Sequence, residues 1–135
     1  NVAWVFREFP LTELHPNALK HAEAAECAEV VAGNDAFWKF ADMLFANQPV
    51  DPAQYGTYAK SLGIDGDAFA TCYADAVKNV DARILADRKN ALDLGAEGAP
   101  YSLILVTGQP PVVMNGAYPP EAVKLLIEQA VQSAN

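Results

Sequence analysis

The chain has 135 residues, of which 52% are hydrophobic and 19% are charged, and nine Lys and Arg face 17 Asp and Glu for a net charge of −8. This length and hydrophobicity can support a buried core, which excludes a disordered tail. The acidic balance argues against nucleic acid as a partner, since phosphates repel negative charge. No apolar run reaches the roughly 18 residues of a membrane span, and no signal peptide is visible. Because the chain begins with Asn1 and not with Met, we expect a processed, trimmed or partial product.

The first segment is an apolar run at positions 2–6, rich in β-branched and aromatic residues. It is apolar on both faces and stops at the polar pair Arg7-Glu8. This pattern predicts a strand that is covered on both sides of a sheet. Pro10 follows shortly, and proline cannot donate to a strand ladder.

From about residue 15 to 95, apolar residues recur at helical spacing, interrupted by glycines, prolines and capping residues. This pattern predicts five helices. The fifth helix is expected to turn Val80, Ile84, Leu85, Leu92 and Leu94 inward. The expected bounds are Pro16 to Gly33, Asn34 or Asp35 through Phe45, Asp51-Pro52 to Leu62, Asp65 or Asp67 through Val77, and Asn79 to Gly95.

After residue 100, the pattern of apolar residues changes from helical spacing to the pattern typical of strands. Residues 101–107 predict a strand, residues 108–111 a turn, and residues 112–114 a second strand that completes a hairpin. A last helix is expected from Pro119-Pro120 onward. The order of strand, helices, two strands and helix predicts one α/β domain over residues 1–135, with a helical insertion at about 15–95.

Few residues offer catalytic chemistry. The chain has no Gly-rich phosphate loop, no metal-spaced His/Cys cluster and no Gly-x-Ser-x-Gly, so it indicates neither a metal site nor a cofactor. His15 and His21 do not share a helical face well, and we interpret both as solvated or capping. Glu23, Glu26 and Glu29 follow one helical stripe, which is typical of a solvated face.

Two further features are more informative. Cys27 and Cys72 lie too far apart for a Cys-x-x-Cys redox pair. They are either two buried thiols or a disulfide, which would stabilise by roughly 4 kcal/mol through loop closure. The Ala99-Pro100 bond immediately precedes a strand, where a cis peptide bond can occur.

The chain resembles the DsbA-like thiol–disulfide oxidoreductases of the thioredoxin superfamily. The matching segments occur in the family's order along nearly the whole chain. They are Phe6-Arg7-Glu8-Phe9-Pro10-Leu11, His15-Pro16-Asn17-Ala18 with Ala24-Ala25-Glu26-Cys27-Ala28, the stretch 37–45, Gly98-Ala99-Pro100-Tyr101, and Met114-Asn115-Gly116-Ala117.

The resemblance implies a thioredoxin-like sheet with a helical insertion, in which Pro100 is the cis-proline beside the redox site. Ala99, Pro100 and Tyr101 would line the substrate groove, and Ala99 replaces the Thr or Val that is common before this proline. The resemblance also implies a structural disulfide between Cys27 and Cys72, and a location in the periplasm or cell envelope of a bacterium.

The family's first strand and its Cys-x-x-Cys helix are missing from this chain, so no catalytic residue is expected here. The missing strand would lie between residues 2–6 and residues 103–106. A longer parent protein, a second chain or a swapped protomer could supply it, or the neighbouring strands could close into a rearranged sheet. The implied function is that of a disulfide oxidoreductase domain that acts on thiol-bearing proteins or peptides and is incomplete and inactive as given. The alternatives are a non-catalytic peptide-binding or chaperone module and, more remotely, an α/β domain with an unrelated ligand pocket.

Overall fold

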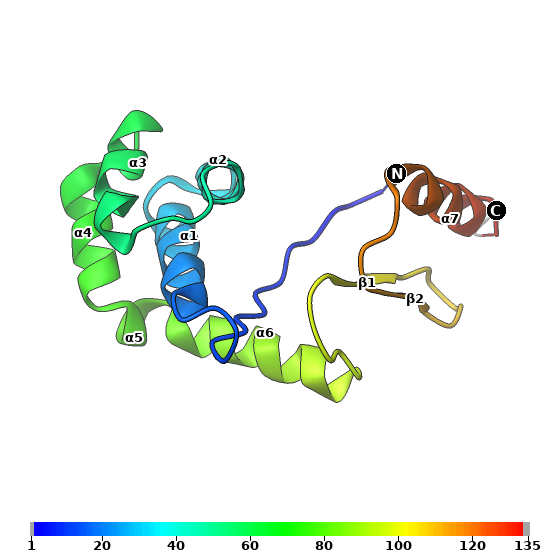
Figure 1. Cartoon of the computed structure of the whole chain (residues 1–135). Helices are drawn as coiled ribbons and strands as arrows, with labels where there is room; N and C mark the ends of the chain where they lie inside the picture. Colours follow the sequence, from blue (N-terminus) through cyan, green and yellow to red (C-terminus); the bar gives the residue numbers. More distant parts are fainter. Residues whose placement is uncertain (1, 134–135) are drawn as a thin grey trace. The chain divides into compact units, whose positions relative to one another are not determined.

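The computed structural model describes residues 2–133 of the chain. These residues divide into two compact units, with the boundary between Lys89 and Asn90. Each unit is described by itself, and Figure 1 labels its elements. This division does not test whether the two units belong to one domain over residues 1–135, so that expectation stays a prediction.

Unit 1 is helical, and local sequence signals explain where its helices begin. The side chain of Asp51 accepts a hydrogen bond from Ala53 N at 2.9 Å, and that of Asp65 accepts one from Ala68 N at 2.8 Å, so each caps the segment that follows. The predicted helices are confirmed, although two of them are divided. The elements are α1 (Ala18–Ala32), α2 (Asn34–Ala46), the 3₁₀ helix η1 (Pro52–Gln54), α3 (Tyr55–Ser61), α4 (Gly66–Ala74), α5 (Ala76–Asn79) and α6 (Asp81–Asp93), which continues past the unit boundary.

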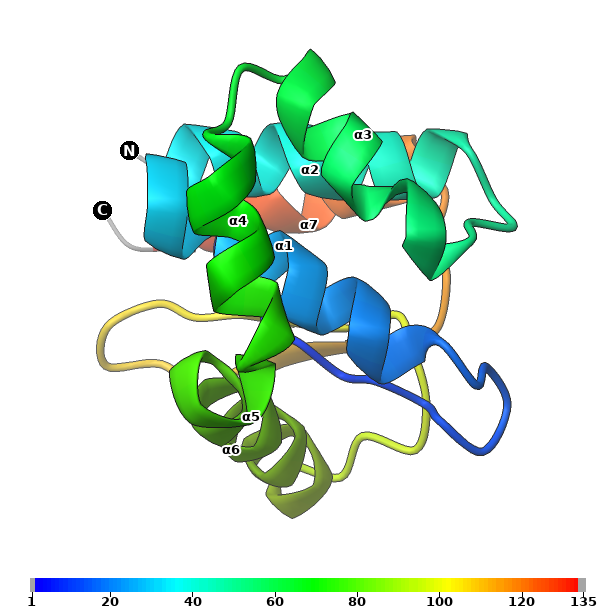
Figure 2. The ribbon, with the colours of Figure 1, turned by 90° about the vertical axis from the view of Figure 1, so that its left-hand side faces the viewer.

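The core of unit 1 forms around α1, which packs against α2 and α4 (Figure 2). Ala24 and Ala28 of α1 are fully buried, and their small side chains permit close approach of the neighbouring helices. Aromatic rings fill the space beyond, with Phe40 of α2 stacked on Phe69 of α4 at 5.5 Å between ring centroids. Burial of large aromatic surfaces is the main source of stability in such a core.

The prediction of a strand at positions 2–6 is wrong, because the structure assigns no strand to residues 2–10. Phe6 packs against Phe37 and Trp38 of α2, whereas Trp4 and Val5 are 65% and 74% exposed. A strand exists through its ladder partner, and the strand expected beside this segment is not in the chain. The apolar run is therefore left without a sheet to join.

Unit 2 contains the predicted hairpin and the last helix. Strand β1 (Tyr101–Ile104) pairs antiparallel with β2 (Val112–Asn115), with Leu103 opposite Val113, and helix α7 follows (Pro120–Ser133). Strand β1 is shorter than predicted, and the chain turns after it, where Gln109 N donates to Val106 O at 3.1 Å. The sheet of the described residues has only these two strands.

The inward face predicted for α6 is wrong in part. Val80 and Ile84 are buried, but Leu85, Leu92 and Leu94 are 56%, 46% and 49% exposed. The apolar core of unit 1 ends at Ile84, so the rest of the helix has no apolar surface of that unit to cover it.

Candidate functional site

The loop before β1 holds the residues predicted to contact substrate. Ala99 and Pro100 are exposed, and the peptide bond between them is cis. The carbonyl of Pro100 accepts a hydrogen bond from Gly116 N at 2.9 Å, and the Tyr101 hydroxyl donates to Leu94 O at 2.7 Å. These bonds fix the loop at the start of the hairpin.

The backbone of β1 is paired along one side only. Its partner is β2, and no other strand pairs with it among residues 2–133. An unpaired strand edge presents N–H and C=O groups that an extended peptide can use. The loop at residues 99–101 leads directly into this edge.

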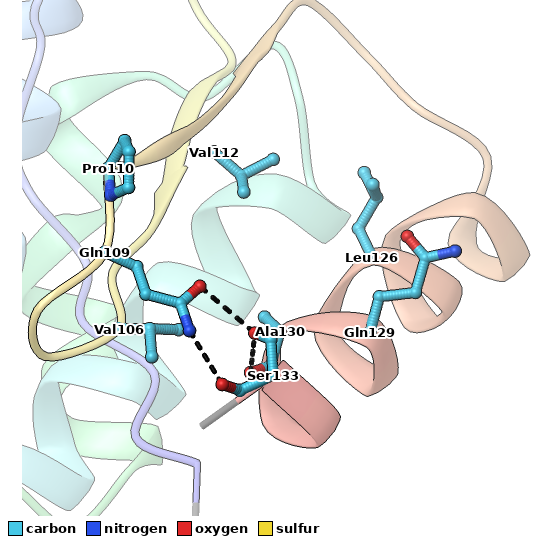
Figure 3. Close-up of a pocket in the computed structure, with 8 residues that line it drawn as sticks. All are labelled: Val106, Gln109, Pro110, Val112, Leu126, Gln129, Ala130 and Ser133. Carbon is cyan, nitrogen blue, oxygen red and sulfur yellow. Dashed lines mark hydrogen bonds between the residues drawn. The ribbon is translucent and has the colours of Figure 1, made fainter. Parts of the chain in front are cut away.

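A pocket of about 220 Å³ lies between the hairpin turn and α7, within unit 2 (Figure 3). Gln109 donates through Nε2 to Ser133 O at 2.8 Å, and the Ser133 hydroxyl lies 3.1 Å from Gln109 Oε1. These bonds hold the turn against the end of the helix. Sequence reasoning did not find this pocket, whose lining consists of Val106, Gln109, Pro110, Val112, Leu126, Gln129, Ala130 and Ser133.

The two cysteines form a disulfide between α1 and α4, which is the pairing that the resemblance implied. Cys27 is 0% exposed and Cys72 is 5% exposed, with 5.8 Å between their Cα atoms. Because the sequence has no other cysteine, the chain carries no free thiol that could attack a substrate disulfide. The bond joins two helices of the core and is buried between them.

The interpretation of the glutamate stripe as a solvated face is wrong for Glu26, which is 2% exposed. Arg83 of α6 explains this burial, because its Nη1 lies 3.0 Å from Glu26 Oε2 and 2.6 Å from Glu29 Oε2. Burial raises the pKa of Glu26, while the charge of Arg83 opposes that rise. Glu23 is also affected, since burial and the neighbouring Asp81 carboxyl raise its pKa to about 6.

A second ionic contact anchors the N-terminal segment to α6. The Arg7 guanidinium pairs with Asp87, and Glu8 N donates to Asp87 Oδ2 at 3.1 Å. Glu8 itself is buried, and burial together with the charges of Glu26 and Asp87 raises its pKa to about 7. Glu8 is thus partly protonated near neutral pH.

His21 was expected to be solvated or capping, but it is half-buried and pairs with a core side chain. Its Nδ1 shares a hydrogen bond with the hydroxyl of the buried Tyr55, and burial lowers the pKa of the histidine. Tyr55 belongs to the core of unit 1, and His21 lies half-buried at its edge. His15 is exposed, as expected.

We also searched the described residues for a possible metal site. Over residues 2–133, no group of three or more His, Cys, Asp or Glu side chains could hold a metal ion. In the same range, no helix is both long enough and apolar enough to cross a bilayer.

Comparison with known proteins gives two kinds of similarity, and no protein-family model matches the chain. The Na⁺/H⁺ antiporter NhaA 1 of Salinispora arenicola is 35% identical over 117 residues, which are 86% of this chain and 16% of the antiporter. The Na⁺/H⁺ antiporter NhaA 3 of Salinispora tropica is 34% identical over 140 aligned residues, 99% of this chain and 19% of the antiporter. The chain therefore spans less than a fifth of the length of these curated relatives.

The fold is shared with a solved structure. The crystal structure of a candidate protein disulfide isomerase from Nitrosomonas europaea superposes with a TM-score of 0.64 at 19% identity, and the match covers 85% of this chain and 58% of that protein. At this identity the likeness concerns the fold alone. The chain shares its fold with that structure over the matched residues, and this agrees with the coarse fold that the DsbA-like resemblance implied.

Proposed function

We propose that the chain is the larger part of a DsbA-like thiol–disulfide oxidoreductase domain, whose Cys-x-x-Cys unit lies outside these 135 residues. The observation that carries the proposal is the fold shared with the candidate disulfide isomerase, over 85% of this chain. The ordered motifs of the sequence support the same family. The two cysteines present are bonded to each other, so exchange would need thiols from elsewhere.

In this proposal, Ala99, Pro100 and Tyr101 contact the substrate peptide. Two observations support the role. Ala99 and Pro100 are exposed, and the hydrogen bonds of Pro100 O with Gly116 N and of the Tyr101 hydroxyl with Leu94 O hold the loop in place. A reduced, extended polypeptide would pair with the exposed backbone of this loop while its thiols react, and the open edge of β1 would be taken by the missing strand.

The reduction of insulin by dithiothreitol tests whether this chain by itself catalyses thiol–disulfide exchange. The chain alone is expected to give the uncatalysed rate, whereas the longer natural polypeptide is expected to accelerate the reaction. In that longer polypeptide, Pro100→Ala is expected to lower turnover. Catalysis by the 135 residues alone would contradict the proposal.

A non-catalytic peptide-binding module is the second candidate, and it is favoured by the combination of an open strand edge with bonded cysteines. The two candidates differ in their need for thiols. If the module binds without catalysis, a cysteine-free unfolded polypeptide is expected to bind the natural protein equally well before and after alkylation of all thiols. Binding that is lost on alkylation would support the oxidoreductase.

The strand missing beside β1 has two possible sources in this proposal, a longer parent polypeptide or a second chain. Light scattering on the isolated chain distinguishes them. A protomer of 14.5 kDa that exchanges strands with a copy is expected to give twice that mass. A chain that remains monomeric, together with a longer polypeptide in the source cells, would support the parent-protein origin.

The antiporter relatives support a further proposal about that parent, namely that this module belongs to the polypeptide of an ion transporter. The supporting observation is identity of 34% over 99% of this chain with part of one antiporter. An antiserum against the chain is expected to detect a polypeptide several times longer in the membrane fraction. A short soluble antigen would contradict it.

An extracytoplasmic location is also proposed, since disulfides persist in oxidising compartments. The Cys27–Cys72 bond supports it. Whole cells are quenched with acid, and the protein is then alkylated in denaturant at neutral pH, which is expected to leave both cysteines unlabelled until reductant is added. Labelling of both before reduction would place the chain in a reducing compartment.

A further inference from the structure

Strand β2 ends with an asparagine that is followed directly by a glycine. Asn115-Gly116 is the only Asn-Gly pair in the sequence. Asn115 is exposed, and its side chain makes no hydrogen bond within residues 2–133. Gly116 has a φ of +98°, a conformation that side chains disfavour, so the chain requires glycine where it leaves the strand. The hairpin therefore places the residue with the least hindered backbone nitrogen directly after an exposed amide.

This dipeptide has the groups for a reaction of the chain with itself. The backbone nitrogen of Gly116 can lose its proton and attack Cγ of the Asn115 amide, which forms a five-membered succinimide ring. The bond between Cγ and the amide nitrogen breaks, and that nitrogen leaves with the proton as ammonia. Water then opens the ring at one of its two carbonyl groups and gives aspartate or isoaspartate. The net reaction consumes one water, releases one ammonia and replaces a neutral amide with a carboxyl group, which is ionised at neutral pH.

A hydrogen bond of the hairpin engages the attacking atom. Gly116 N donates to Pro100 O at 2.9 Å, which extends the ladder by one bond beyond the Tyr101–Asn115 pair. A nitrogen that donates to a carbonyl keeps its proton and is not free to attack. The acceptor is held by its neighbour, since the Tyr101 hydroxyl donates to Leu94 O at 2.7 Å. The bond from Gly116 to Pro100 therefore has to open before the ring can close.

These contacts do not depend on the strand that the proposed function places outside the chain. The missing strand would pair with the open edge of β1, whereas Asn115 belongs to β2, which pairs with the other edge of β1. Every residue of the two hydrogen bonds, and Asn115 itself, lies in unit 2. The arrangement is therefore complete within one unit of this chain.

We propose that Asn115 is a deamidation site whose conversion is governed by the opening of the hydrogen bond between Gly116 N and Pro100 O. The closed bond preserves the asparagine, and each opening frees the nitrogen. Isoaspartate adds a methylene group to the main chain at residue 115, so Gly116 N no longer matches Pro100 O in register. Conversion to isoaspartate therefore releases the loop at residues 99–101. Only the consequence for substrate binding rests on the proposed function, since the conversion itself needs no partner.

Peptide mapping by mass spectrometry measures the conversion in the full chain. The chain is incubated at pH 8 with its disulfide intact, once folded and once unfolded in guanidinium chloride, and is then digested with trypsin. We expect conversion at Asn115 to be at least about 10-fold slower in the folded chain, because local opening has to precede it. Asn90 lies in the same tryptic peptide and is followed by alanine, so it is the internal reference and should remain unconverted. Equal rates in the two states, or conversion at Asn90 as fast as at Asn115, would overturn the proposal.

Two matched variants test the role of the hydrogen bonds. Tyr101→Phe removes the hydroxyl that donates to Leu94 O and is expected to speed conversion in the folded chain about 2- to 10-fold, the range for the loss of one hydrogen bond. Tyr118→Phe removes the hydroxyl of a 45% exposed tyrosine close to Asn115 and is expected to leave the rate unchanged. Amide hydrogen exchange at Gly116 should accelerate together with conversion in Tyr101→Phe, because both require the same opening. Equal acceleration in the two variants, or faster conversion without faster exchange at Gly116, would show that this bond does not govern the reaction.

Discussion

Glu8 is an acidic residue that is buried in unit 1. Its pKa is raised from an ordinary value of 4.5 to about 7, first by burial and then by the charges of Glu26 and Asp87. An acid with a raised pKa binds more protons in the folded state than in the unfolded state. Its favourable contribution is therefore complete below pH 4.5 and is lost as the pH rises toward about 7.

We predict that the protein loses stability between pH 4.5 and 7 because of this group, and that Glu8→Gln removes much of the loss. Glu23, with a pKa raised to about 6, adds to the same trend. His21 opposes it, because a histidine whose pKa is lowered loses stability as the pH falls below 6.5. Guanidinium unfolding at pH 5 and pH 8 measures the difference, which for a shift of the size seen at Glu8 is on the order of 3 kcal/mol.

The matched control is Glu13→Gln, because the side chain of Glu13 is 71% exposed. It is expected to leave the pH dependence as in the natural sequence. A pH profile that is the same in Glu8→Gln as in Glu13→Gln would show that Glu8 is not the group responsible.

Helix α1 shows how small residues determine the packing of a whole element. Ala28 is fully buried between helices, and we predict that Ala28→Leu overpacks this contact and lowers the free energy of unfolding by about 1–3 kcal/mol. Ala32→Leu, at the exposed end of the same helix, is the control and is expected to change stability by less than about 0.5 kcal/mol. Thermal unfolding followed by circular dichroism compares the two, and equal effects would contradict the packing argument.

The disulfide acts between elements, since it ties α1 to α4 across 45 residues. We predict that the double variant Cys27→Ala/Cys72→Ala loses about 4 kcal/mol of stability, because an unfolded chain without the cross-link has more entropy. Dithiothreitol is expected to destabilise the natural protein by a similar amount and to leave the variant unaffected. If the reductant destabilised both equally, the bond would not be its target.

The elements differ in how far the sequence could predict them. Helices such as α4 begin at a local signal, the Asp65 cap, and the hairpin begins at a change of period, so both were found. The strand expected at positions 2–6 required a partner outside the chain, which periodicity cannot report. Burial of Glu26 was missed because it depends on Arg83, which joins it only in the fold.

At the scale of the whole molecule, the two units differ in what they bury. The buried residues of the main apolar core cluster lie within residues 22–84, whereas the buried apolar residues in the described part of unit 2, residues 90–133, are Ala96, Met114 and Ala130. A segment below roughly 50 residues with so small a core is marginal at best without a disulfide or a partner. The sequence predicted one domain and gave no sign of this imbalance.

We predict that a fragment of residues 1–93, which keeps α6 whole, folds alone with its disulfide intact, and that a fragment of residues 94–135 does not. Circular dichroism with urea titration is the measurement. The larger fragment is expected to show a cooperative transition, and the smaller one a featureless slope. A cooperative transition in the smaller fragment would contradict this distribution of stability.

Exposed apolar side chains also affect the tendency of the chain to aggregate. Trp4, Val5 and Leu105 are each at least 65% exposed, and such surface favours clustering between molecules. The charge of −8 keeps copies apart by mutual repulsion. Added salt shortens the range of that repulsion, so the purified chain should stay dispersed at low ionic strength and coalesce as sodium chloride is raised.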